Sequence, residues 1–240
     1  MLLLSIDFET TGLDPEKDRI TEVGAVLWST GYKRAMETAS FFVNTGVPVS
    51  KEITEITGIT DKMLMKFGVE ESWMVDEIRR MSSLADAFIG QNCREFDRYF
   101  LLAAAKRVGI EIPDKLWIDT RTDLPATVES KRLTYMAADH GFLNPFPHNA
   151  VTDAFTVLRI AACYDESVMV ERAKSPVVVL QSLQPFEQND AAKKLKFMFK
   201  PDLGKRWLRV VKQCDLAQLE KDAPFDMCVV TDITPNQVWH

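Results

Sequence analysis

The chain has 240 residues, of which 46% are hydrophobic and 27% charged, and this composition excludes an intrinsically disordered protein because it supports a buried core. The net charge of −6 excludes a protein that coats nucleic acid by charge alone. The four cysteines form no CxxC pair, so buried free thiols in a reducing cytosol are expected rather than disulfides or a zinc site. The apolar run Met1–Ile6 is too short to span a bilayer and lacks the flanks of a signal peptide, which predicts a cytoplasmic protein without a membrane partner.

The chain is expected to begin with three strands and to continue with helices and short strands in alternation. Apolar and β-branched runs predict strands at Leu2–Glu9, Ile20–Trp28, Glu37–Asn44, Ala87–Gln91 and Leu116–Asp119. Helices are predicted at Glu70–Ala87, Glu95–Val108, Lys131–His140 and His148–Tyr164, and a loop-rich stretch from Pro48 to Gly68. This order predicts an α/β fold in which helices flank a mixed five-stranded sheet, an RNase H-like arrangement.

The pattern restarts near Arg172–Pro176, which predicts a domain over residues 1–171 and a small α+β domain over residues 172–240. Strands are expected at Val177–Gln181, Trp207–Lys212 and Met227–Val230, and helices at Gln188–Phe197 and Leu216–Asp222. Charge divides in the same way, because residues 1–171 carry 18 basic and 27 acidic side chains and residues 172–240 carry 11 basic and 8 acidic ones. An acidic body with a basic tail fits an enzyme that holds cations in the first domain and meets phosphate with the second.

The first segment that carries chemistry is SIDFETTG, from Ser5 to Gly12. Alternation along a strand places Asp7 and Glu9 on one face and leaves Ile6 for the core. Neighbouring carboxylates repel each other unless a cation lies between them, and two oxygen ligands at the end of a rigid strand suit Mg²⁺ or Mn²⁺. The segment therefore indicates a cation site, with an exposed acidic strand end as the alternative.

Two further segments are weak alone. NCREFD ends in Asp97, at the opening of a predicted helix, where a carboxylate also stabilises the helix dipole. HNAVTD spans His148 to Asp153, and five positions rotate by about 500° on a helix, so its ends do not share a face. We therefore expect His148 where the loop enters the helix and Asp153 about one turn inside it, a mobile base above a rigid ligand.

Together the segments IDFETTG, NCREFD and HNAVTD resemble the motifs of the DEDDh exonuclease family, which is similar to the epsilon proofreading subunit of bacterial DNA polymerase III. The resemblance covers about residues 1–165 and includes ITEITGIT, although Thr57 stands where relatives often have a histidine. The second motif also departs from the family, since Gly90–Cys93 replaces an alanine, a histidine and an asparagine. Neither departure touches a predicted metal ligand.

The resemblance implies a two-metal 3′→5′ exonuclease. Two Mg²⁺ ions, with Mn²⁺ as a substitute, would be held by Asp7, Glu9, Asp97 and Asp153. His148 would take the proton from the attacking water, a task that suits a side chain titrating near neutral pH.

The same resemblance assigns substrate-binding residues around the metals. Backbone groups of Thr10, Thr11 and Gly12 would hold the 3′-terminal nucleotide. Leu13 or Phe96 would pack on its base, which is a sequence-tolerant contact, and Asn92 is the remaining substrate-binding candidate.

A sister subclass carries a tyrosine four positions before the last aspartate, and Tyr135 and Asp139 have that spacing. The histidine form is favoured because Asn149, Ala150 and Ala154 also fit it. Tyr135 is then expected to pack, and Asp139 to lie on the surface at a helix end.

The basic tail contains a run of lysines and arginines interleaved with Phe197, Phe199 and Trp207. The run resembles the small C-terminal domain of some phage-encoded exonucleases of the family. Its candidate nucleic-acid ligands are Lys193, Lys194, Lys205 and Arg206. A docking site for a protein partner within residues 172–240 and a solvated basic face remain alternatives.

The predicted function is release of nucleoside monophosphates from the free 3′ end of a nucleic acid, with DNA as the expected substrate. Trimming of RNA 3′ ends by the same chemistry is the nearest alternative, because discrimination of the 2′-hydroxyl depends on contacts that the sequence does not locate. A non-catalytic nucleic-acid-binding module and a phosphodiesterase acting on small nucleotides are the others.

Overall fold

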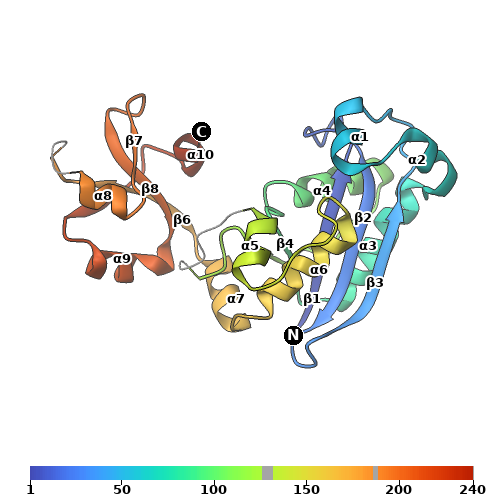
Figure 1. Ribbon diagram of the computed structural model, residues 1–240, viewed down its shortest axis with the longest axis horizontal. Coiled ribbons are helices and arrows are strands. Elements are labelled where there is room, and N and C mark those ends of the chain that lie inside the picture. Colours follow the sequence, from blue (N-terminus) through green and yellow to red (C-terminus); the bar gives the residue numbers. More distant parts are fainter. Residues whose placement is uncertain (126–131, 186–188, 240) are drawn as a thin grey trace. The chain divides into compact units, whose positions relative to one another are not determined.

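The computed structural model describes residues 1–125, 132–185 and 189–239, and it consists of two compact units, Met1–Ala173 and Lys174–His240. Each unit has its own sheet (Figure 1). Within the described residues, no helix is long and apolar enough to cross a membrane.

The first unit is built on a mixed five-stranded sheet with the order β3-β2-β1-β4-β5. Its strands are β1 (Leu2–Thr10), β2 (Ile20–Ser29), β3 (Arg34–Phe42), β4 (Ala87–Gly90) and β5 (Leu116–Asp119). The first three are antiparallel, whereas β4 pairs parallel with β1 and β5 parallel with β4. The mixed sheet predicted from the element order is therefore present, and β1 lies at its centre.

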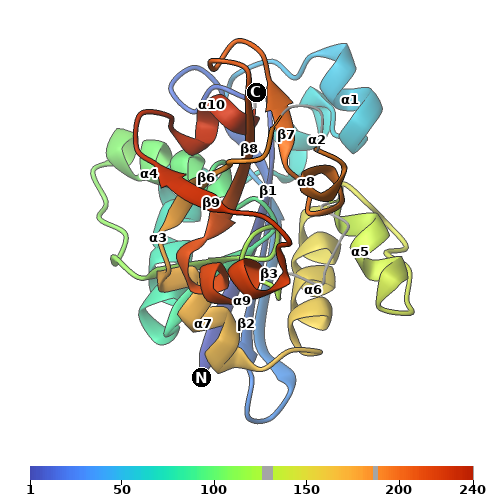
Figure 2. The same ribbon diagram turned by 90° about the vertical axis from the view of Figure 1, so that its left-hand side faces the viewer.

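Helices cover both faces of this sheet, as Figure 2 shows nearly edge-on. The helices of the unit are α1 (Lys51–Thr57), α2 (Asp61–Phe67), α3 (Glu71–Leu84), α4 (Asp97–Val108), α5 (Leu133–Asp139), α6 (Ala150–Ala161) and α7 (Glu166–Lys174). One core lies under α3 and α4 and contains Ile6 and Phe8 of β1. The other lies under α6 and contains Leu3 of the same strand. Alternation along β1 thus supplies both cores.

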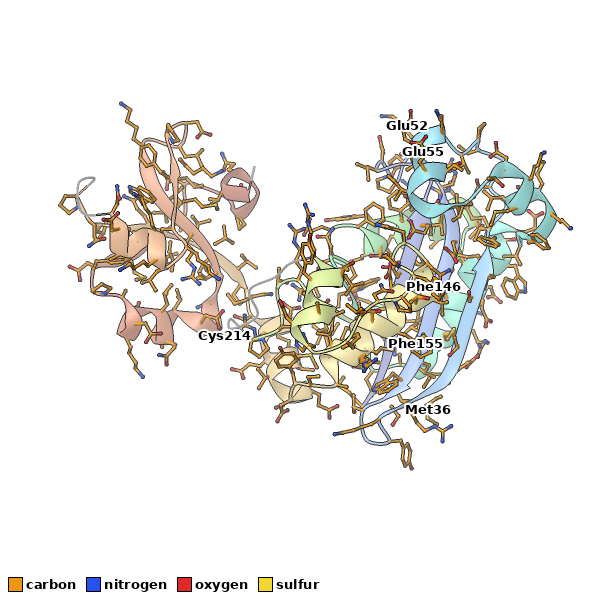
Figure 3. The ribbon with its side chains drawn as sticks, viewed as in Figure 1. Met36, Glu52, Glu55, Phe146, Phe155 and Cys214 are labelled. Atoms are coloured by element: carbon orange, nitrogen blue, oxygen red, sulfur yellow. The ribbon has the colours of Figure 1, made fainter. Side chains whose placement is uncertain are left out.

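The prediction of a loop-rich stretch from Pro48 to Gly68 is wrong, because the helices α1 and α2 occupy most of this range. Ser50 and Thr60 cap these helices by accepting hydrogen bonds from the backbone N–H three residues later, at 3.3 and 3.4 Å. The helix α1 buries none of its residues, and Glu52 and Glu55 project from it (Figure 3). Because α1 has no buried face, its sequence lacks the hydrophobic periodicity by which an amphipathic helix is predicted, and its serine cap is the remaining signal.

Two other elements differ from the sequence prediction. The third strand runs from Arg34 to Phe42 and not from Glu37 to Asn44, because its antiparallel register with β2 continues to Arg34 opposite Ser29. The helix α7 was not predicted, although Met169 of it belongs to the core under α6. The predicted start of α5 at Lys131 lies outside the described residues.

The cysteines were expected to be buried, and that expectation is wrong for three of them. Cys93 is buried, whereas Cys163, Cys214 and Cys228 are exposed, and all four are free thiols.

The second unit has a four-stranded antiparallel sheet with the order β7-β8-β6-β9. Its elements are β6 (Val177–Ser182), α8 (Asp190–Lys194), β7 (Met198–Lys200), β8 (Arg206–Lys212), a 3₁₀ turn (Gln213–Asp215), α9 (Leu216–Asp222), β9 (Met227–Val230) and α10 (Pro235–Trp239). One small core joins the sheet to α8 and α9, and another contains Val238 of α10. The elements β7 and α10 were not predicted, and the expected helix start at Gln188 lies outside the described residues.

Candidate active site

The strand β1 carries the first two candidate ligands at its C-terminal end. Ile6 and Phe8 point into the core under α3 and α4, so Asp7 and Glu9 face α6. The Ser5 hydroxyl, also on the α6 face, donates a hydrogen bond to the Ala154 carbonyl oxygen at 3.0 Å. This bond ties the middle of β1 to α6 beside the two carboxylates.

Asp97 is the first residue of α4 and is only 2% exposed. Its Oδ1 accepts a hydrogen bond from the backbone N–H of Phe8 at 3.0 Å. Because Phe8 lies between Asp7 and Glu9 in the strand, this bond joins the helix start directly to the acidic end of β1. The helix dipole alone would hold a carboxylate here, but the bond to β1 sets its position relative to the other two.

The remaining candidates meet at the start of α6. Asn149 caps this helix, accepting hydrogen bonds from the backbone N–H and the hydroxyl of Thr152 at 3.3 and 2.6 Å. His148, just before the cap, has a φ of 63°, and its backbone N–H donates to Asp153 Oδ2 at 2.9 Å. The other Asp153 oxygen accepts from the Asn144 amide. The histidine thus lies at the entrance of the helix, and Asp153 lies in its first turn.

These segments bring the five candidate active-site residues together. Glu9, His148 and Asp153 each offer a ligand atom, and the three atoms lie within 4.8 Å of one another. Asp7 is close enough to Asp97, Asp153 and Glu9 for their charges to raise its pKa. His148 is exposed at the surface of this cluster, whereas Asp97 and Asp153 are buried.

The cluster is electrostatically unfavourable without a counter-charge. Burial, followed by repulsion from Glu22, Asp153 and Asp97, raises the pKa of Glu9 from 4.5 to about 8. Burial also raises the pKa of Asp97 from 3.8 to about 8, against two backbone hydrogen bonds that lower it. The pKa of Asp7 is raised well above its usual range by burial and by the neighbouring carboxylates. Oxygen donors packed so closely fit hard divalent cations, which favour the ionised form of every one of them.

The metal-free protein is therefore expected to lose stability as the pH rises. The unfolded chain ionises Glu9 and Asp97 near their ordinary values of 4.5 and 3.8, whereas the folded protein keeps both protons up to about pH 8. Between the unfolded and folded pKa values, the folded state binds more protons than the unfolded state. The stability that these protons contribute is therefore fully present at low pH and is lost as the pH rises towards 8. Thermal unfolding in chelator from pH 5.5 to 8.5 measures this fall.

Divalent cations should reverse the fall, since bound cations favour the ionised carboxylates. Glu9→Gln should flatten the profile in chelator, and Glu95→Gln, a change on the exposed side of the same segment as Asp97, is the matched control. A stability that is flat with pH in chelator would contradict the repulsive cluster.

A fifth carboxylate, Glu22 of β2, belongs to the same cluster but was not identified from the sequence. It lies opposite Glu9 in the β1–β2 register and is 4% exposed. Its Oε1 accepts a hydrogen bond from Asn149 Nδ2 at 2.9 Å, and its Oε2 accepts from the Ala150 N–H at 3.4 Å. Gly24 leaves room for the same turn, because a Cβ there would lie 2.1 Å from the Ala150 carbonyl carbon. The signal in the sequence that could have identified Glu22 is that it is a charged residue within an otherwise apolar strand.

The turn after β1 is held mainly by its own side chains. Thr10 Oγ1 donates to the Gly12 carbonyl oxygen at 2.6 Å, and Thr11 Oγ1 donates to Asp18 Oδ1 at 3.1 Å. A Cβ on Gly12 would lie 2.4 Å from the Asp18 carboxylate, so the glycine makes room for that side chain. Leu13 projects from the turn with 83% of its surface exposed. The turn is thus ordered around Asp18 and presents one apolar side chain.

The other first-unit candidates for substrate contact lie after β4. Phe96 is half-buried and packs against Phe100, with ring centroids 4.8 Å apart. Asn92 has a φ of 59° and lines a hollow with His148 and Asp153. Asn92 is therefore beside the acidic cluster, whereas the ring of Phe96 is engaged with the core.

The competing tyrosine signature does not converge on the acidic cluster. Tyr135 is 57% exposed, with the Arg132 guanidinium 5.9 Å above its ring, and it lines the hollow that contains His148. Asp139 is exposed at the last position of α5, where a surface residue was expected. Within the described residues, His148 offers a ligand atom next to Glu9 and Asp153 whereas the carboxylate of Asp139 does not, so the geometry favours the histidine form.

The four cations singled out in the second unit do not form one patch of free charge. Lys193 on α8 lies 5.6 Å above the Trp207 ring and 3.4 Å from Asp190. Arg206 forms an ion pair with Asp232 at 2.9 Å, and it lies on the sheet face opposite to Trp207, its neighbour in β8. Lys194 and Lys205 are exposed. The sequence could not reveal this division because Arg206 and its partner Asp232 are 26 residues apart in the chain and meet only in the folded unit.

Comparisons with known proteins agree with this architecture. The sequence profile of the exonuclease family matches residues 4–161. The DNA polymerase III PolC-type proteins of Caldanaerobacter subterraneus and Thermotoga maritima are each 31% identical, over 116 and 153 residues. These matches cover 48% and 62% of this chain but only 8% and 10% of those proteins, so the chain spans about a tenth of their length.

Solved structures share the fold. E. coli Exonuclease I in complex with a dA16 oligonucleotide has a TM-score of 0.63 at 16% identity, covering 75% of this chain and 48% of that one. The nuclease domain of 3'hExo, a DEDDh family member bound to rAMP, has a TM-score of 0.57 at 20% identity, covering 68% and 90%. The predicted RNase H-like sheet flanked by helices is confirmed by these neighbours. The resemblance predicted from the three motifs is also confirmed, and the chain belongs to the exonuclease family.

Proposed function

We propose that this protein is a divalent-metal-dependent 3′→5′ exonuclease that releases nucleoside monophosphates from a nucleic-acid end. The observation that carries the proposal is the convergence of Asp7, Glu9, Asp97 and Asp153 beneath one exposed histidine. Membership of the exonuclease family supports the same reaction class.

The carboxylate cluster is suited to two Mg²⁺ or Mn²⁺ ions, which Asp7, Glu9, Asp97 and Asp153 would hold. The raised pKa values of Glu9 and Asp97 support this assignment, because a buried set of acids without cations loses charge. When bound, the cations would lower the pKa of the attacking water and stabilise the negative charge that develops on the leaving oxygen.

His148 supplies the proton acceptor in this proposal. Its ring is exposed above Glu9 and Asp153, so it can take a proton from an attacking water and return it to solvent. Its backbone is held by the N–H bond to Asp153, and the cap that follows is held by Glu22 through Asn149. These bonds orient the histidine relative to the ligands while its side chain remains accessible.

We propose DNA as the substrate, with RNA as the second candidate. DNA is supported by the relatives, which are DNA polymerases, and RNA by a fold neighbour bound to rAMP. Product analysis decides between them, using 5′-labelled single-stranded DNA, duplex DNA and RNA with Mg²⁺ and with chelator. A ladder that shortens from the 3′ end only with metal supports the proposal, and internal cuts or no cuts contradict it.

The second unit, proposed as a nucleic-acid grip, makes a prediction about salt. Each phosphate neutralised by a cation releases counterions, so the log–log slope of affinity against salt should steepen by about −0.7 per contact on a single strand. Replacing Lys193, Lys194, Lys205 and Arg206 by Gln should flatten the slope, with the smallest share from Arg206 because Asp232 already pairs with it. The measurement is binding to a long oligonucleotide in Ca²⁺ instead of Mg²⁺, which suppresses cleavage.

Lys221→Gln is the control, because this exposed lysine lies on α9 of the same unit and outside the proposed set. Cleavage of a very short oligonucleotide should survive the quadruple change, because the metal site lies in the first unit. If the quadruple variant has the same salt slope as the unaltered protein, the second unit does not bind nucleic acid through these cations, and a protein partner for residues 172–240 is favoured.

A further inference from the structure

A hollow of about 800 Å³ adjoins the acidic cluster and is lined by charges of both signs. His148 and Asp153 belong to its wall, and so do Arg121 and Arg132. Its volume lies in the range of pockets that hold a whole ligand and exceeds what one phosphate group requires. The hollow therefore has room for more of a nucleic-acid strand than the reacting phosphate.

Arg121 is held in this wall by a buried carboxylate. Asp119, at the end of β5, is 3% exposed, and its Oδ1 accepts hydrogen bonds from the backbone N–H groups of Arg121 and Asn92, each at 2.9 Å. The Arg121 guanidinium then donates from Nη1 to Asn92 Oδ1 at 2.7 Å. Asn92 has a φ of 59°, which is uncommon for residues other than glycine, and its backbone N–H bond to Asp119 holds it in this conformation. Arg121 is thus held at its backbone by Asp119 and at its guanidinium by Asn92.

The charge of Arg121 is not matched by an acid in the part of the chain that the structure describes. Two other arginines of the first unit are each matched by an acid, since Arg94 pairs with Asp123 and Arg107 with Glu71. Arg121 instead has a neutral amide as its bonded partner, and its side chain is exposed to the hollow. An arginine presents five donors in a planar fork, so most of them remain for an anion, and phosphate fits that fork.

We propose that Arg121, positioned by Asp119 and Asn92, binds the phosphodiester next to the scissile one on the 5′ side of the substrate strand. The proposal rests on the exonuclease function proposed above. The scissile phosphate belongs to the carboxylate cluster and its cations. Because the strand ends at its 3′ terminus, the only neighbouring phosphodiester lies on the 5′ side. Arg121 then makes the enzyme prefer a strand with at least two phosphodiesters over a single diester.

The test compares two substrates in Mg²⁺. Thymidine 5′-(p-nitrophenyl phosphate) contains only a scissile phosphodiester, whereas a decathymidylate contains the second one. Arg121→Gln should lower kcat/KM on the decathymidylate about ten- to a hundredfold, the scale of a lost charge-assisted hydrogen bond, and leave the nitrophenyl ester unchanged. Arg79→Gln is the matched control, because this exposed arginine is on α3, across the sheet from α6, and pairs with Asp76.

A neutral linkage gives a second arm. A methylphosphonate at the penultimate linkage removes one negative charge from the phosphodiester that Arg121 is proposed to bind. The unaltered protein should lose about as much kcat/KM on this oligonucleotide as Arg121→Gln loses on the natural one, and Arg121→Gln should lose little more. Arg121→Lys should restore part of the activity, since it returns the charge without the fork.

Each other outcome overturns the inference. Equal losses on both substrates would mean that Arg121 acts at the scissile phosphate or through the fold, and no loss on either would mean that it does not bind the strand. If the losses of kcat/KM caused by Arg121→Gln and by the methylphosphonate are additive, Arg121 does not contact the penultimate phosphodiester. Failure of the exonuclease proposal itself is recognised separately, because the unaltered protein would then cleave neither substrate.

Discussion

Asp7→Asn is expected to remove nearly all turnover and, at the same time, to stabilise the metal-free protein. The change keeps the shape of the side chain but takes away a charge that Asp97, Asp153 and Glu9 all oppose. Cation chemistry at such a site is worth several kcal/mol, so activity should fall about a thousandfold or more. Relief of about 1 kcal/mol of repulsion would raise Tm in chelator by about 2–4 °C.

Two measurements check this result, namely single-turnover cleavage in Mg²⁺ and thermal unfolding in chelator and in Mn²⁺. The unaltered protein should be stabilised strongly by Mn²⁺ and Asp7→Asn weakly, because the variant has lost a ligand. Asp14→Asn is the control, since Asp14 lies on the turn after β1 and pairs with the exposed Lys17. A fully active Asp7→Asn enzyme, or full activity in chelator, would end the metal-site assignment.

His148→Gln should lower kcat about a hundredfold or more, the usual scale for the loss of a general base. The fold should survive, because position 148 is held by its own backbone N–H, which donates to Asp153, and the cap that follows is made by Asn149. Metal affinity should be largely kept, since four carboxylates remain. The measurement is kcat as a function of Mn²⁺ concentration, which separates a lost base from a lost ligand.

Tyr135→Phe is the comparison for this variant, because Tyr135 carries the rival signature and lines the same hollow. It should leave kcat nearly unchanged. A half-saturating Mn²⁺ concentration that rises steeply in His148→Gln would make the histidine a ligand and not a base. A crippling tyrosine change with a harmless histidine change would assign the protein to the other subclass.

Much of the first unit was readable from local pattern. Alternation in SIDFETTG separates Asp7 and Glu9 from the core residues Ile6 and Phe8, and the structure has the same division. The rotation of a helix over HNAVTD places His148 before the cap and Asp153 inside the first turn, as observed. These features depend on residues that are close in the chain, so strand and helix periodicity are sufficient to predict them.

Features without local periodicity were missed. The helix α1 depends on a serine cap and buries none of its residues, and α10 is a five-residue helix at the end of the chain. The short strand β7 has three residues and is defined by its pairing with β8. Each of these elements is too short or too exposed for a hydrophobic pattern to reveal it.

The sequence by itself determined the family, the five candidate active-site residues and the mixed sheet, because these follow from ordered motifs and short-range periodicity. Only the tertiary structure decided which distant groups meet them. Glu22 reaches Asn149 across 127 residues, and Arg121 reaches Asn92 across 29. Arg206 finds Asp232 from the end of the chain. Sheet order and register set these pairs, and a buried carboxylate or an unmatched arginine has no signature in the residues beside it.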